Sequence, residues 1–215
     1  MPFGFLRRDR REGSGAGPSS APARPRTRGV EFSALTEEWR LSGVMDLDGR
    51  LTDALNKREP IAIRDVQWAP LDGSKGLEPA PGLKSVDPYD LIVVLGGEGS
   101  LPPLTDAERV AHKVHKVPFD VALELPPFRV LGTVYLYPGS EPERLLDRAT
   151  EMFLPVTDAL ATLGDVAVTE TTAEVVLVNR FYLRGVEQID RRTGERPPKL
   201  PGAPLGGISW QDRAR

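Results

Sequence analysis

The sequence predicts an α+β fold built as a tandem duplication of one small module, in which two strands, a helix and two further strands follow one another. Three observations support this prediction. The segment Trp39–Leu47 is echoed by Phe128–Leu136, with a glycine at the same central place, Gly43 in one and Gly132 in the other. Apolar and polar residues alternate in both segments, as in strands with one buried face. The links between neighbouring strands are short, which favours a mainly antiparallel sheet.

The first module is predicted to span residues 30–95. Its first two strands, Val30–Leu35 and Trp39–Leu47, are separated by a link short enough for a hairpin. A short helix is expected over Arg50–Asn56, because its apolar residues recur at helical spacing, and Asp48 is expected to cap this helix.

Two further strands and a long loop complete the first module. The third strand begins at Ile61, and residues 71–88 form a loop rich in Pro and Gly. Asp90–Leu95 is a nearly continuous apolar run, which is typical of a strand buried on both faces. Residues 96–118 then link the modules, and a capping box that starts at Thr105 predicts a helix in this linker.

The second module is predicted to span residues 119–190 in the same order. Its first two strands turn at Pro126 and the proline that follows it. Ser140 and Glu143 form a second capping-box pattern, which predicts a helix in the place that the first module gives to its own. Val175–Val178 is matched to the apolar run of the first module. We expect the two modules to form a pseudo-twofold pair that covers its own sheet faces or edges.

Two pairs of residues hold matching places in the modules. Gly43 and Gly132 each lie in mid-strand, which indicates a bulge, a bend or a close backbone approach rather than a chemical role. Asp65 and Asp158 each follow the start of the third strand, where an aspartate most often stabilises a turn.

Both ends of the chain are predicted to be disordered, basic tails. Residues 1–29 contain seven Arg against two acidic residues, and residues 191–215 contain six basic residues against two acidic ones. Both tails are rich in small residues or Pro and have little to bury, so they cannot offset the entropy of ordering. The body, residues 30–190, is strongly acidic, with 27 acidic against 15 basic residues.

The composition narrows the classes of function. Cys is absent, which excludes disulfides, thiolate metal sites and a cysteine nucleophile, and favours a reducing compartment. We therefore expect a cytoplasmic protein, and its Arg, Ala and Pro usage suggests a bacterial one. We find no catalytic signature and no metal-binding pattern, and we expect no cofactor.

The main functional hypothesis is a non-enzymatic binding or scaffold module, an adaptor, whose basic tails recruit a partner. The partner would be a protein, bound through a sheet edge or through a tail peptide, and self-association into a homo-oligomer is a further possibility. Nucleic acid is disfavoured as a partner, because the body is acidic and lacks an aromatic and basic surface pattern.

An alternative hypothesis rests on the glycine-rich loop that follows the apolar run of the first module. Its residues are Gly96, Gly97, Glu98, Gly99 and Ser100. The run and the loop together resemble the strand and Gly-Gly-Asp-Gly-Thr loop of the NAD kinase and diacylglycerol kinase superfamily, with Glu98 in place of the family's Asp. The resemblance covers about eleven residues and implies a phosphate- or nucleotide-binding domain, in which the glycines let backbone N–H groups approach phosphate.

A third hypothesis is a peripheral membrane adaptor that uses residues 3–11. An apolar start followed by an arginine cluster can touch lipid and meet anionic headgroups. The contact residues would be Phe3, Phe5, Leu6, Arg7, Arg8, Arg10 and Arg11. Trp210, near the other end of the chain, is a further candidate contact with a partner.

Overall fold

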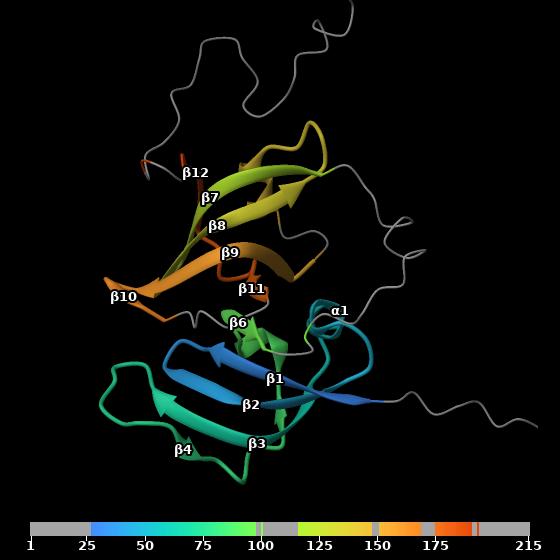
Figure 1. Ribbon diagram of the computed structural model, residues 1–215, viewed down its shortest axis with the longest axis vertical. Coiled ribbons are helices and arrows are strands. Elements are labelled where there is room, and N and C mark those ends of the chain that lie inside the picture. Colours follow the sequence, from blue (N-terminus) through green and yellow to red (C-terminus); the bar gives the residue numbers. More distant parts are fainter. Residues whose placement is uncertain are drawn as a thin grey trace, which may run out of the picture.

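The computed structural model describes residues 27–97, 100, 116–147, 151–168, 175–190 and 193. The predicted tails lie almost wholly outside these residues, as does the predicted linker helix at Thr105. The strands of the first half are β1 (Arg28–Leu35), β2 (Trp39–Leu47), β3 (Ile61–Pro70), β4 (Glu78–Pro79), β5 (Ser85–Val86) and β6 (Val93–Gly96). Those of the second half are β7 (Val117–Leu125), β8 (Phe128–Leu136), β9 (Phe153–Leu163), β10 (Val166–Ala167), β11 (Val175–Asn179) and β12 (Gly185–Gln188). Figure 1 shows the two halves one above the other, with β6 and β11 between them.

The prediction of an α+β fold is wrong, because the described residues form one antiparallel sheet of 12 strands with a single short α-helix. That helix, α1 (Leu51–Asn56), lies where the first module was expected to have one, but its N-cap is Arg50 rather than Asp48. In the second half the expected helix is only a 3-10 turn, η2 (Pro142–Leu146), and no side chain caps it. A second 3-10 turn, η1 (Pro88–Asp90), precedes β6.

The buried side chain of Arg180 accounts for the short helical turn in the second half. Its guanidinium donates to the carbonyl oxygens of Leu145 at 2.9 Å and Arg144 at 3.3 Å, and also to that of Asp147. A continuing α-helix would need the first two carbonyls as acceptors for its own next turn. Burial lowers the pKa of Arg180, while the carboxylates of Glu151 and Asp147 oppose that shift. The carbonyl oxygens therefore solvate a cation instead of extending a helix.

Each half pairs its strands in the same order. The strand order is β6-β1-β2-β3-β5 in the first half and β12-β7-β8-β9-β11 in the second. In each half, the last strand in the sequence therefore pairs with the first. The hydrogen bonds before the last strand also correspond. Asp87 Oδ1 accepts from Tyr89 N at 2.9 Å, and Asn179 Oδ1 accepts from Phe181 N at 3.0 Å. By these equivalences, β5 of the first half corresponds to β11 of the second, and β6 corresponds to β12.

The match between the two apolar runs is therefore wrong. Strands β6 and β11 do not hold equivalent places, because β6 is the last strand of its half and β11 the one before the last. Instead they pair with each other, with Val93 opposite Val178 and Gly96 opposite Val175. Every residue of both strands is buried, as the apolar runs indicated.

The paired strands β6 and β11 are shared by two hydrophobic cores. Val94 and Leu177 pack into the core that α1, β1, β2 and β3 cover, whereas Val93 and Val178 pack into the core of the second half. The joint unites non-equivalent strands, so it is a head-to-tail contact and not the pseudo-twofold pair that we expected. Two asparagines reinforce this joint between the halves.

Each of these asparagines uses both ends of its amide. Asn56 on α1 donates to Phe153 O at 3.2 Å and accepts from Phe153 N at 2.7 Å, across the joint. Asn179, which is fully buried, donates to Leu91 O at 2.7 Å and Pro88 O at 3.3 Å in the other half. Both amides satisfy backbone groups that burial would otherwise leave unpaired.

The mid-strand glycines and the matching aspartates form two equivalent β-bulges, which confirms the structural role expected for Gly43 and Gly132. Asp65 and Val66 lie opposite Gly43, and Asp158 and the next residue lie opposite Gly132. The first bulge residue is left-handed in both, with φ of 53° at Asp65 and 48° at Asp158. Aspartate tolerates this conformation better than most residues, and a bulge of this kind bends its strand.

We expect Gly132→Ala to destabilise the protein by about 1–3 kcal/mol. A Cβ at this position would lie 2.5 Å from Val156 Cγ1 and 2.9 Å from Thr157 O, which is backbone that cannot easily move. The matched control is Gly76→Ala, where a Cβ would meet open space, so that the stability should change by less than about 1 kcal/mol. Urea denaturation measures both, and equal losses would contradict the bulge geometry.

A second prediction compares the two equivalent capping residues. Asn179→Asp should cost about 3 kcal/mol or more, because it places a carboxylate against the carbonyl oxygens of Pro88 and Leu91 in a buried site. Asp87→Asn should be nearly neutral, since the exposed Asp87 needs only an oxygen that accepts from Tyr89 N. Thermal denaturation at neutral pH tests the pair. Similar effects of the two substitutions would contradict the tie across the joint.

Candidate functional site

The glycine-rich loop begins at the end of β6, inside the sheet. Gly96 is paired with Phe32 of β1 and Val175 of β11. Gly97 N donates to Glu31 O at 2.9 Å, and the N–H of the buried Ser100 donates to Gly97 O at 3.1 Å. Glu98 and Gly99 lie outside the described residues.

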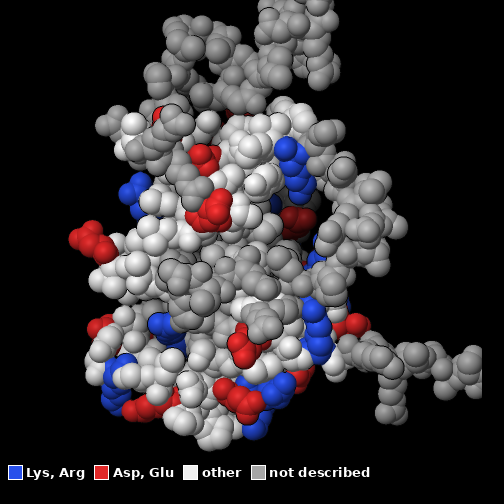
Figure 2. Space-filling view, viewed as in Figure 1, with Lys and Arg blue, Asp and Glu red and all other residues white. Residues whose placement is uncertain are grey.

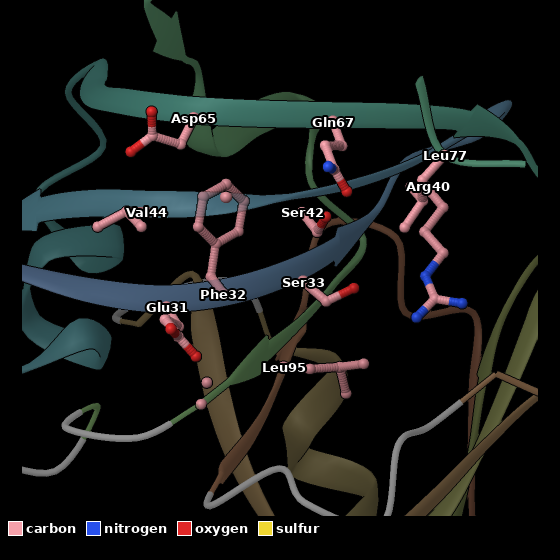
Figure 3. A pocket seen from close by; sticks show the side chains of 13 residues that line it. Glu31, Phe32, Ser33, Arg40, Ser42, Val44, Asp65, Gln67, Leu77 and Leu95 are labelled. Atoms are coloured by element: carbon pink, nitrogen blue, oxygen red, sulfur yellow. The ribbon is translucent and has the colours of Figure 1, made fainter. Parts of the chain in front are cut away.

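A cleft of about 610 Å³ lies beside Gly96 and Gly97. Figure 3 shows that β1, β2 and β3 supply most of its side chains, with Ser33 from β1, Ser42 from β2 and Gln67 from β3, and that Leu77 and Leu95 complete them. Ser33 is buried, and its hydroxyl has no hydrogen-bond partner among the described residues. The cleft has mixed polarity and includes carboxylates as well as Arg40.

The described geometry gives the glycines a packing role. A Cβ on Gly96 would lie 2.7 Å from Ser100 Cβ and 2.9 Å from Leu51 Cδ2, and one on Gly97 would lie 3.2 Å from Glu31 Cβ. The N–H groups of Gly97 and Ser100 already have carbonyl acceptors, so they are not available to phosphate. The carboxylate of Glu31 next to the loop also opposes an anionic ligand.

A second hollow borders the free side of β5. This strand pairs with β3 alone among the described residues, and its residues Ser85 and Val86 line a groove of about 420 Å³. We call this hollow the edge groove. The turn between β1 and β2, η1 and Tyr182 of the second half complete its lining. The joint between the halves therefore brings Tyr182 of the second half into the lining of a groove that β5 of the first half also lines.

Carboxylates dominate the lining of the edge groove. The acidic residues are Glu37, Glu38, Asp87 and Asp90, all of them exposed, and none of the described lining residues is basic. Figure 2 shows both signs of charge mixed over the face that it presents, whereas the groove lining has one sign. Burial raises the pKa of Tyr182, and the carboxylates of Glu37 and Asp90 raise it further, so this hydroxyl stays neutral.

The walls of the edge groove are held in place by local contacts. Trp39 stacks on Trp68 with ring centroids 4.6 Å apart. Thr36 Oγ1 accepts from Trp39 N at 3.0 Å and fixes the turn. Tyr182 Oη donates to Tyr89 O at 3.2 Å, across the two halves. The groove thus combines fixed aromatic rings, carboxylates and an unpaired strand edge.

No local pattern in the sequence marks the edge groove. Its carboxylates come from two loops that lie far apart in the chain, and its strand edge is only two residues long. The residues that sequence analysis did single out for membrane or partner contact, Phe3 to Arg11 and Trp210, lie outside the described residues.

Comparison with known proteins adds no functional information. No protein-family model matches the chain, and no curated protein or solved structure is significantly similar to it. Within the described residues, no group of three or more His, Cys, Asp or Glu side chains is arranged to hold a metal ion. None of the described helices has the length and apolar character required to cross a membrane.

We expect Gly96→Ala to destabilise the protein by about 1–3 kcal/mol, because its Cβ would collide with Ser100 and Leu51. The matched control is Gly82→Ala, where a Cβ would meet open space and the melting temperature should be unchanged. ATP and inorganic phosphate should not raise the melting temperature of the natural chain. A clear rise with either, lost in a folded Gly97→Ala variant, would instead support the phosphate-loop hypothesis.

Proposed function

We propose that this protein is a non-enzymatic binding module, an adaptor, that holds an extended basic segment of a partner protein against β5. Two observations support this proposal: β5 has a strand on only one side among the described residues, and its residues help to line a groove with four carboxylates and two aromatic rings. An extended peptide that joins a sheet edge gains main-chain hydrogen bonds, and flanking pockets select its side chains.

The sheet offers other edges, but they suit strand addition less well. β12 pairs with β7 and also has η2 packed against it, which protects it. β4 consists of Glu78 and Pro79, and proline cannot donate to an added strand. β5 is the edge that lies beside a preformed groove.

The charge of the edge groove favours Lys and Arg in the bound segment. Four clustered carboxylates create a negative potential that attracts a cationic partner and speeds association at low ionic strength. Trp39 and Tyr182 add ring faces, over which an ammonium or guanidinium group gains a further cation–π attraction. The affinity should therefore fall with added salt.

The basic tails of this chain fit the same proposal as a second set of contacts. Residues 1–29 and 191–215 have the sign of charge that binds acidic surfaces, so they would engage an acidic face of the partner or of a larger assembly. We place this activity in the cytoplasm, a reducing compartment that suits a chain without Cys.

A charge-reversal variant tests the proposal. The probe is a fluorescent eight-residue peptide of alternating Arg and Val, measured by fluorescence anisotropy at low salt. Glu37→Lys combined with Asp90→Lys should weaken its binding at least tenfold, because two of the four carboxylates become repulsive. The matched control, Asp53→Lys combined with Asp165→Lys, makes the same change of net charge at exposed sites outside the groove. Equal weakening in both variants, or no binding to the natural chain, would refute the proposal.

A further inference from the structure

The two halves of the chain allow the orientation of a bound strand to be inferred, because β5 and β11 occupy equivalent places. Val86 lies opposite Ile61 at the start of β3, and Val178 lies opposite Leu154 at the start of β9. Ile61 and Leu154 each precede the left-handed aspartate of the bulge by four residues. Val86 therefore corresponds to Val178.

The turns that follow β5 and β11 confirm this correspondence. Asp90 N donates to Asp87 O at 3.0 Å, and Tyr182 N donates to Asn179 O at 3.2 Å. The last strands then begin alike, since Ile92 N donates to Leu35 O and Arg184 N to Glu124 O, both at 2.8 Å. Asp87 thus corresponds to Asn179, and Lys84 corresponds to Val176.

The difference between β5 and β11 is that the outer side of β11 is occupied. There β6 runs antiparallel to it, with Val93 opposite Val178 and Leu95 opposite Val176. Asn179 N donates to Ile92 O at 2.8 Å, which fixes the start of the pairing. The pairing of β6 with β11 therefore shows how an added strand would pair with the equivalent, unpaired side of β5.

Transferred to β5, the same register brings charged residues opposite the bound strand. The place of Ile92 falls opposite Asp87, and the place of Leu95 falls opposite Lys84. Both Asp87 and Lys84 are exposed, whereas the corresponding Val176 is buried. Opposite charges that face each other across antiparallel strands stabilise the pair, and like charges destabilise it.

We propose that the partner segment runs antiparallel to β5, with a Lys or Arg opposite Asp87 and an Asp or Glu three residues later opposite Lys84. This inference rests on the proposed function and adds a direction and a charge order to it. Asp90 lines the same groove as Asp87, so that its carboxylate adds to the attraction for a cation at the first position. A segment with the two charges exchanged would place like charges together at both positions.

The chain itself contains a sequence of this pattern. In the segment of β12, which corresponds to β6, the place of Ile92 is held by Arg184, directly before the strand, and the place of Leu95 by Glu187 within it; both are exposed. A synthetic peptide with the sequence of residues 183–189 is therefore a suitable probe. A second peptide that exchanges its Arg and Glu has the same composition and net charge, so that it controls for general electrostatic attraction.

Fluorescence anisotropy measures the affinity of each peptide for the natural chain and for a double variant, Lys84→Glu with Asp87→Lys. The natural chain should prefer the first peptide at least fivefold, and the double variant should reverse that preference. The double variant keeps the net charge of the chain, so a reversed preference cannot come from a change in overall charge. Its melting temperature shows separately whether it is folded. If the double variant does not fold, Lys84→Glu alone should abolish the preference for the first peptide.

Equal affinity for both charge-ordered peptides would overturn the proposed register. The proposed function is tested separately by the Arg-Val peptide, whose binding would still support it. If neither charge-ordered peptide binds but the Arg-Val peptide does, the inference also fails. Self-association of the full chain that Lys84→Glu abolishes and added Glu187→Lys restores would assign the edge to a second copy of the chain. That outcome would overturn the assignment to a partner protein.

Discussion

The pairing of β6 with β11 is the interaction on which the rest of this structure depends. Each strand is buried on both faces, because one face belongs to each of two cores. Amide side chains make hydrogen bonds to backbone groups at the ends of this pairing. Asn179 satisfies carbonyl oxygens of the other half, and Asn56 satisfies both backbone groups of Phe153. The two halves are thereby tied into one body by backbone, core and side-chain contacts together.

The same joint explains why one strand edge stays open. A head-to-tail contact between two equivalent units uses one edge of each and leaves the complementary edges at the two ends. In this chain the end at β12 has η2 packed against it, where Arg180 gathers the carbonyl oxygens of the turn. The end at β5 instead borders a groove with four carboxylates. We therefore propose that the partner binds at the β5 end of the sheet, where the edge strand remains unpaired on one side.

Part of this fold could be predicted from residue patterns. The glycines at 43 and 132 indicated close backbone approach, and they face left-handed aspartates in equivalent bulges. The prediction that Asp90–Leu95 is buried is wrong only at Asp90, which is exposed in η1. Such local features are predictable because alternation and glycine placement report directly on burial and backbone space.

The remainder depended on contacts that no local pattern contains. Two apolar runs were matched to each other because both are buried, but burial alone cannot distinguish equivalent strands from partners. The capping-box pattern at Ser140 did not open a helix, since the buried Arg180 takes the carbonyl oxygens from a distant part of the sequence. The edge groove also went unseen, because the fold alone brings Glu37, Asp87 and Tyr182 together.

Hydrogen–deuterium exchange distinguishes strand addition at β5 from binding in the cleft beside Gly96. The full chain would be measured with and without a saturating concentration of the Arg-Val peptide, with residues 83–87 resolved from the residues around Gly96. We expect slower exchange at residues 83–87 when the peptide is bound, because an added strand protects the amides on the open side of β5. Unchanged exchange there, with protection at Gly96 and Gly97 instead, would contradict the account and move the binding site to the other cleft.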